Sequence, residues 1–260
     1  MYAKAINDLL RGLSLYKIWI YQAWHEMTAK YKRTILGSFW IAGSMVVTSL
    51  CLALVWGGLM GRDMHDILPY IMCGIVCFQL VAFAFNDGPE LFLGSGSMIK
   101  NHANPYSYYV AETVCRSVLT FAHNVLIFFV VEACVMAFAI PHWTFLLGFP
   151  IVVVTIFCWG TVAGLVAARF RDLRFVLPYI SQLLFYVTPI IWRVGDISTG
   201  RAYVSQFNPL YGLLEVMRAP LLGHAPPERA WVLALSSMVT GVIAWVLVFS
   251  PFRRRIPFWV

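Results

Sequence analysis

The sequence predicts an all-α membrane protein with six transmembrane helices, an amphipathic helix before the first span and short helices in two loops. Of the 260 residues, 60% are hydrophobic and 12% are charged, whereas a soluble domain has roughly 25% charged residues. The apolar residues gather in six long runs, and a helix needs roughly 20 such residues to cross a bilayer. The short segments of alternating polarity that mark a membrane barrel are absent from the sequence.

The chain divides into a cytoplasmic arm, residues 1–34, and a single transmembrane domain, residues 35–260. Along the arm, apolar residues recur at spacings of three and four from Ile6 to Tyr31, which puts them on one side of a helix. Because Trp24 and Tyr31 belong to this stripe, we expect the helix to lie in the membrane interface. The arm either anchors the chain at the membrane or also contacts a partner protein.

The six predicted spans cover approximately residues 35–59, 67–86, 113–140, 145–168, 175–192 and 230–250. Only the third contains charged residues, Arg116 near one end and Glu132 inside. Glu132 has either a structural role or a place on a transport path. Glu112 and Arg116 lie one turn apart and are expected to pair.

Positive charges predict the orientation of the chain in the membrane. Thirteen Lys and Arg residues fall on the side of the two chain ends and five on the opposite side. The asymmetry is clearest beside the spans, at residues 30–33 and 253–255. Because cytoplasmic loops carry the excess of Lys and Arg, we expect both termini to be cytoplasmic. The net charge of +7 then reflects topology and lipid headgroups rather than a nucleic-acid partner.

Two loops are expected to contain helices that do not cross the membrane. In the cytoplasmic loop 87–110, a Gly/Ser run at 94–97 and Pro105 bracket one or two helical turns, a size that fits a groove on a soluble protein. In the external loop 193–229, helical spacing from Leu210 to Leu221 predicts an interfacial or re-entrant helix, too short to span. Because irregular backbone at membrane depth must be covered, this loop is a candidate outer gate.

The sequence contains no recognised catalytic motif. No Lys follows a Gly, so the phosphate-binding P-loop is missing, and any ATP that drives this protein is expected to bind a partner chain. His25-Glu26 begins a zinc-protease pattern, but Ala29 stands at the position of the second His. We expect no metal site and no cofactor, and interpret the six cysteines as packing residues.

Three stretches of the chain have the order and spacing of motifs from a known family. They are the basic and aromatic run 30–40, the turn 168–172 continuing to Thr188-Pro189-Ile190-Ile191, and Asn208-Pro209-Leu210 followed by Arg218. Together they resemble the permeases of ABC transporters that export O-antigen, capsule or teichoic acid, and the O-antigen (Wzm-like) branch fits best. The resemblance extends over nearly the whole chain.

The resemblance implies a homodimer of six-helix subunits in the bacterial inner membrane. Each subunit would bind one cytoplasmic ATP-binding cassette subunit, and the dimer would export a glycan on a lipid carrier. In this family the first and fifth spans line the channel, the short cytoplasmic helix couples to the ATPase, and the external helices before the last span form the gate.

Carried over residue by residue, the resemblance implies four kinds of site. Tyr31, Lys32 and Arg33 would form the site of substrate access. Alternatively, their positive charges only anchor the chain on the cytoplasmic side of the membrane. The residues implied for the channel are Phe39, Trp40, Tyr179, Phe185 and Tyr186; for ATPase coupling, Ser97, Met98, Ile99, Lys100 and Asn101; and for the external gate, Asn208, Pro209, Leu210, Leu213, Leu214, Met217 and Arg218.

Two other classes of protein compete with this interpretation. A permease of the same architecture would export a drug, haem or a lipid, and a narrow apolar groove rather than a wide aromatic-lined tunnel would favour it. A membrane-bound glycan-processing enzyme would need a cluster of Asp, Glu or His on one membrane face, and the sequence has none.

Overall fold

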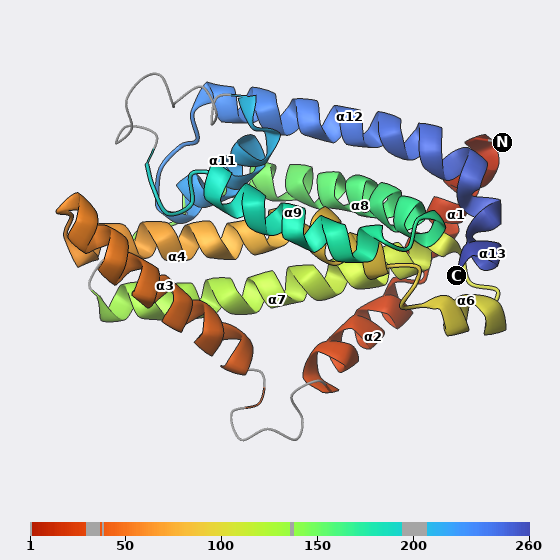
Figure 1. The fold of residues 1–260 in the computed structure, drawn as a ribbon, viewed down its shortest axis with the longest axis horizontal. Helices are drawn as coiled ribbons and strands as arrows, with labels where there is room; N and C mark the ends of the chain where they lie inside the picture. Colours follow the sequence, from red (N-terminus) through yellow and green to blue (C-terminus); the bar gives the residue numbers. More distant parts are fainter. Residues whose placement is uncertain (1, 30–36, 38, 136–137, 194–206) are drawn as a thin grey trace.

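The computed structural model describes residues 2–29, 37, 39–135, 138–193 and 207–260, and within these residues the chain forms helices and no β-strand. Figure 1 shows an elongated bundle with both chain ends at the same end. The long helices are α3 (Phe39–Met60), α4 (Met64–Val81), α7 (Tyr106–Cys134), α8 (Phe145–Arg169), α9 (Leu173–Val187) and α12 (Glu228–Phe252). The shorter ones are α1 (Tyr2–Ser14), α2 (Tyr16–Ala29), α5 (Phe83–Asn86), η1 (Gly88–Glu90), α6 (Gly96–Asn101), α11 (Pro209–Leu221), η3 (Arg253–Arg255) and α13 (Ile256–Trp259).

Within the described residues, five helices are long and apolar enough to cross a membrane: α3, α4, α7, α8 and α12. This confirms an all-helical, multi-pass membrane protein. The predicted span 175–192 is different, because helix α9 has 15 residues, or about 22 Å at the usual helical rise. Pro189 cannot continue the helix and holds Thr188 in an extended conformation. The chain then runs on as buried, irregular backbone to Ile191.

Helix α4 lies at the centre of the packing. It contacts α3, α7 and α11, while α8 packs against α11 and α12. Helix α11 lies close to α12 at Gly212, where a Cβ atom would overlap with the side chain of Leu233. The core therefore forms around α4, α8 and α11, and it holds the non-spanning helix α11 inside the bundle (Figure 1).

The arm, predicted as one helix, forms two helices that meet at Leu15. The Ser14 hydroxyl donates a hydrogen bond of 2.8 Å to the Arg11 carbonyl, and Gly12 lies between them. Such side-chain bonds compete with the helical pattern, and Gly/Ser pairs are frequent at kinks. Of the predicted apolar stripe, Leu10 and Trp24 are more than half exposed, whereas Met27 is buried.

The two ends of the chain are tied to the start of α7. The Asp8 carboxylate accepts hydrogen bonds from the Ser107 amide at 3.0 Å and the Ser107 hydroxyl at 2.9 Å. It is also 3.7 Å from Arg253, which donates a hydrogen bond to the Lys4 carbonyl. Because a carboxylate at this position satisfies free amides and the helix dipole, α7 begins at Tyr106 rather than at the predicted residue 113.

Candidate functional site

Helix α6 is the short helix that the composition of loop 87–110 predicts. It lies toward the end of the bundle that holds both chain ends (Figure 1). Its predicted coupling residues do not share one environment: Ser97, Met98, Lys100 and Asn101 are exposed, whereas Ile99 is buried against the protein. Any partner on α6 therefore meets the four exposed residues, and Ile99 holds the helix in place.

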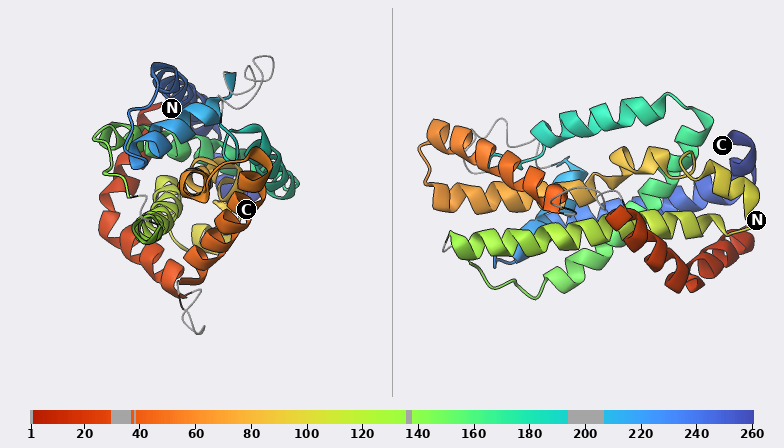
Figure 2. Two further views of the ribbon diagram at one scale, coloured as in Figure 1. Left: turned by 90° about the vertical axis from the view of Figure 1, so that its left-hand side faces the viewer. Right: turned by 90° about the horizontal axis from the view of Figure 1, so that it is seen from below.

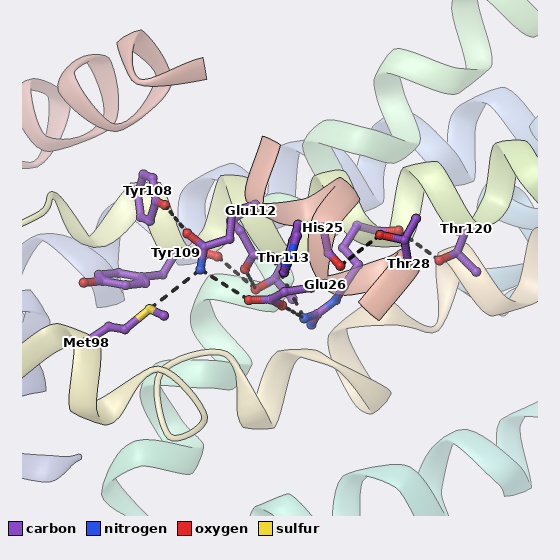
Figure 3. Close-up of polar contacts among 11 residues, drawn as sticks. His25, Glu26, Thr28, Met98, Tyr108, Tyr109, Glu112, Thr113 and Thr120 are labelled. Atoms are coloured by element: carbon purple, nitrogen blue, oxygen red, sulfur yellow. Dashed lines mark hydrogen bonds and ion pairs between the residues drawn. The ribbon is translucent and has the colours of Figure 1, made fainter. Parts of the chain in front are cut away.

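One side chain of the arm joins α6 to the bundle. The Gln22 amide nitrogen of α2 lies 3.7 Å from the Met98 sulfur and donates to Glu26 at 3.3 Å. The Gln22 carbonyl oxygen accepts a hydrogen bond of 2.7 Å from the Tyr108 hydroxyl of α7. Figure 3 shows these contacts, in which Met98 of α6 and Tyr108 of α7 approach the same side chain from two different helices. Helices α2, α6 and α7 are thus linked through Gln22.

A charged cluster continues from this link. Arg116 of α7 is 2.6 Å from Glu26 of α2 and 3.9 Å from Glu112 of its own helix. The predicted Glu112–Arg116 pair is present, but the nearer carboxylate belongs to the arm (Figure 3). Sequence reasoning missed Glu26 as a partner. The available signal was Arg116 itself, since a charge inside a span requires a partner.

A cavity of about 830 Å³ lies beside this cluster, between α2, α4 and α7. Its polar lining includes Glu26, Gln79 and Arg116. Ala29, the last residue of α2, also lines it. The predicted substrate-access residues, Tyr31, Lys32 and Arg33, follow Ala29 closely in the chain and lie outside the described residues.

The predicted channel aromatics lie on α3 and α9, which occupy the same side of the bundle (Figure 2, left panel). Phe39, Trp40, Tyr179 and Tyr186 are more than half exposed. Phe185 is different, because it is half-buried and contacts the ring of Phe78 edge-on at 5.5 Å between centroids. On α9 only Ser181 is fully buried, and most of its other residues are exposed.

The Asn-Pro-Leu motif starts α11 and fastens it to the end of α9. The Asn208 side-chain oxygen accepts a hydrogen bond of 3.0 Å from the Leu210 amide, and Pro209 takes the first helical position. The Asn208 amide nitrogen donates to the Thr188 hydroxyl at 2.9 Å. Two stretches that carry the family resemblance therefore meet in space.

Arg218 makes the second connection between these stretches. It is 2% exposed, donates a hydrogen bond of 2.6 Å to the Pro189 carbonyl and forms an ion pair with Glu215. Its guanidinium lies 4.1 Å from the ring centroid of Tyr70, whose hydroxyl donates to the Trp192 carbonyl at 3.2 Å. These groups satisfy carbonyls that the early end of α9 leaves free.

The predicted gate helix packs against other helices of the same chain. The gate residues Asn208, Leu210, Leu213, Leu214, Met217 and Arg218 are buried, and Pro209 is exposed. The arrangement gives α11 a fixed place against α4, α8 and α12. Its role as a gate stays a prediction.

Comparison with known proteins assigns the chain to a family. Residues 19–222, which run from α2 to the end of α11, match the family of ABC-2 type transporters. The chain is 21% identical to an O-antigen export system permease protein RfbA of Klebsiella pneumoniae over 236 residues, covering 88% of this chain and 90% of that protein. It is also 21% identical to an O-antigen export system permease protein RfbA of Myxococcus xanthus over 227 residues, covering 85% of each. The resemblance inferred from the three motifs is confirmed, and the chain belongs to the ABC-2 type transporter family.

Proposed function

We propose that this chain is the membrane subunit of an ATP-driven exporter that moves a lipid-linked polysaccharide of the O-antigen type across the bacterial inner membrane. The observation that carries this proposal is the link through Gln22, because it connects the short cytoplasmic helix α6 to both α2 and α7. A cytoplasmic partner that pushes on α6 would thereby move the arm and the bundle together. The similarity to permeases named for O-antigen export supports the choice of substrate.

The position of the chain ends supports six crossings of the membrane. Both ends lie at one end of the bundle, which fits an even number of crossings (Figure 1). Beside the five long apolar helices, α9 with the buried stretch to Ile191 would supply the sixth crossing. The distribution of Lys and Arg favours a cytoplasmic position for both termini.

Two copies of the chain would form the export path, together with two ATP-binding subunits. The outward aromatic residues of α3 and α9, such as Trp40 and Tyr179, would face this path, where a hydrated glycan needs polar or aromatic contacts. Tyr31, Lys32 and Arg33 would receive the substrate, since cations bind a diphosphate well. The segment Asn208–Leu222 would close the outer side.

The exporter would work by mechanical coupling. ATP-driven closure of the two partner subunits pushes on α6, and the force passes through Gln22 to α2 and α7. The first and fifth spans of the two protomers then part and let the glycan through while its lipid stays in the bilayer. ATP binding must favour the parted state for this coupling to operate.

One observation favours a second candidate, export of a lipid or another apolar molecule. A cavity of about 690 Å³ lies between α8, α9, α11 and α12, with mostly apolar lining residues such as Trp159 and Leu213. A molecule that follows this cavity would need no hydrated path.

Export from vesicles distinguishes the two candidates. The chain is co-expressed with its ATP-binding partner, and ATP-dependent movement of lipid-linked glycan into inverted membrane vesicles is measured. We expect glycan to accumulate in the lumen only when both subunits and ATP are present. Accumulation of lipid without glycan would support the second candidate, and normal surface glycan after deletion of the chain, in a cell with no second exporter, would contradict the proposal.

A further inference from the structure

The cavity between α2, α4 and α7 is polar although the helices around it are largely apolar. From Ile67 to Val81, the residues of α4 are buried except Tyr70 and Gln79, and exposed Gln79 lines this cavity. The volume of about 830 Å³ is within the range of small-molecule sites, roughly 300–1,000 Å³. Because polar groups inside a membrane protein require polar partners, a hollow of this kind suits a polar ligand.

The charged groups at the cavity argue against an anionic ligand. Arg116 already lies 2.6 Å from Glu26 and 3.9 Å from Glu112, so two carboxylates share one guanidinium. A phosphate would have to displace Glu26 from Arg116 and would then meet like charges at close range. The cavity therefore does not suit a diphosphate or an anionic lipid headgroup.

The neutral polar groups provide both donors and acceptors. The Gln79 side-chain oxygen accepts a hydrogen bond of 3.0 Å from Asn124, which leaves the Gln79 amide nitrogen as the donor. The Thr120 hydroxyl donates to the Arg116 carbonyl at 3.0 Å, which leaves the Thr120 oxygen as an acceptor. Asn86 adds another amide to the lining. Hydroxyl groups both donate and accept, so a ligand rich in hydroxyls matches this set.

An apolar wall completes the cavity. Phe121 and Leu80 line it, and the Phe121 ring stacks on Phe149 with 6.2 Å between centroids. A sugar ring has hydroxyls at its edge and C–H groups on its faces, so it can use both kinds of wall. Ala29 at the end of the interfacial helix α2 also lines the cavity, next to where a lipid tail would remain in the membrane.

We propose that this cavity binds the sugar of a lipid-attached glycan within a single protomer. The inference rests on the proposed function, because an exporter of lipid-linked polysaccharide meets such a headgroup. The bound sugar belongs either to the exported glycan itself or to a resident glycolipid of the membrane, and both present the same chemistry. Ile41 of α3, the residue after Trp40, also lines the cavity, so the cavity would hold a sugar before or beside the export path.

Photocrosslinking with matched lipids tests the proposal. The full chain, with its ATP-binding partner, is placed in phosphatidylglycerol nanodiscs with a glucosyl diacylglycerol that carries a diazirine in its acyl chain near the head. A phosphatidylethanolamine with the same acyl chain is the comparison probe. We expect the glucosyl probe to label residues 79–87 and 116–121 preferentially. If unlabelled lipid-linked glycan reduces the labelling, the bound sugar belongs to the exported substrate. If it does not, the bound sugar belongs to a resident glycolipid. Both results support sugar binding.

Two substitutions remove hydrogen bonds without adding charge. Gln79→Leu and Thr120→Val should each lower glucosyl labelling roughly three- to tenfold, the loss expected for one hydrogen bond. Thr240→Val is the matched control, because the Thr240 hydroxyl of α12 also donates to a carbonyl four residues earlier, at 2.8 Å from Ser236, and lies outside the cavity. Its labelling should equal that of the unmodified chain. Thr and Val have nearly the same shape, so folding is preserved.

Equal labelling by the two probes, or labelling that neither Gln79→Leu nor Thr120→Val reduces, would overturn the inference. These results are distinguishable from failure of the proposed function. Vesicle export of glycan without sugar-selective labelling removes only the cavity site, whereas sugar-selective labelling in a chain that exports no glycan removes only the proposed function.

Discussion

The guanidinium of Arg218 donates a hydrogen bond of 2.6 Å to the carbonyl oxygen of Pro189. The contact joins the last turn of α11 to the stretch where α9 has already ended. Carbonyls at membrane depth have no water to bind, so a buried donor has to be supplied by the protein. Arg218 fulfils this requirement with its own charge balanced by Glu215.

Replacing Arg218 by Met should destabilise the protein strongly. The change leaves the Pro189 carbonyl without its donor and Glu215 without its ion-pair partner. We expect the free energy of unfolding to fall by about 3–5 kcal/mol, as for loss of one member of a buried pair. Denaturant unfolding in detergent measures the change. Arg229→Gln, at an exposed position of α12, is the control and should shift stability by less than about 0.5 kcal/mol. An unchanged midpoint for Arg218→Met would show that the contact contributes nothing.

Replacing Tyr108 by Phe should reduce the coupling between ATP use and export. The change removes the hydroxyl that donates to Gln22 at 2.7 Å, at a cost of about 0.5–1.5 kcal/mol. We expect glycan exported per ATP hydrolysed to fall in reconstituted vesicles while membrane insertion stays normal. Tyr109→Phe is the control, because the hydrogen bond to Gln22 comes from the hydroxyl of Tyr108. Equal effects of the two substitutions would rule out the Gln22 link as the route.

Reversing the charge of Lys100 should weaken assembly with the ATP-binding subunit. Lys100 is exposed on α6, where a partner would meet it. We expect Lys100→Glu to lower co-purification of the partner with insertion unchanged. Lys17→Glu makes the same change on α2, and equal losses from both would indicate that general positive charge, rather than α6, holds the partner. Ile99→Ala tests a different role, since truncating this buried side chain should loosen α6 by about 2–5 kcal/mol.

Adding a methyl group at Gly212 should separate α11 from α12. A Cβ atom there overlaps with Leu233 and lies 2.9 Å from the Ala234 amide nitrogen. We expect Gly212→Ala to lower the free energy of unfolding by about 1–3 kcal/mol, as overpacked sites do. Gly58→Ala is the control, because open space surrounds Gly58 on helix α3. The free energy of unfolding of this variant should be unchanged or higher by up to about 1 kcal/mol.

The spans were predictable where an apolar run ends in polar residues. Helix α8 covers Phe145–Arg169 against a predicted 145–168, and α12 covers Glu228–Phe252 against 230–250. The boundaries of α7 and α9 were not predictable in this way. Asp8, far away in the chain, binds the start of α7, and Arg218 from another helix satisfies the Pro189 carbonyl in the stretch after α9. Contacts between distant segments leave no periodic pattern.

The candidate site was predicted in part. The composition of loop 87–110 indicated a short helix at α6, and the family resemblance implied channel-facing aromatics on α3 and α9. The sequence did not identify Gln22, which on an interfacial helix resembles any solvated polar residue until α6 and α7 are placed around it. Nor did it show that Ile99 points inward. The substrate-access residues Tyr31–Arg33 lie outside the described residues and stay a prediction.

The contacts of Asp8 with Ser107 and Arg253 can form only in a fixed order during translation. A ribosome makes Asp8 first, Ser107 next and Arg253 last, so the cap on α7 can form while the second half of the chain is still being translated. The ion pair with Arg253 closes only after α12 has been made. A nascent chain therefore carries an unfinished arm until that point, and the finished contact marks a chain in which α1, α7 and α12 have come together.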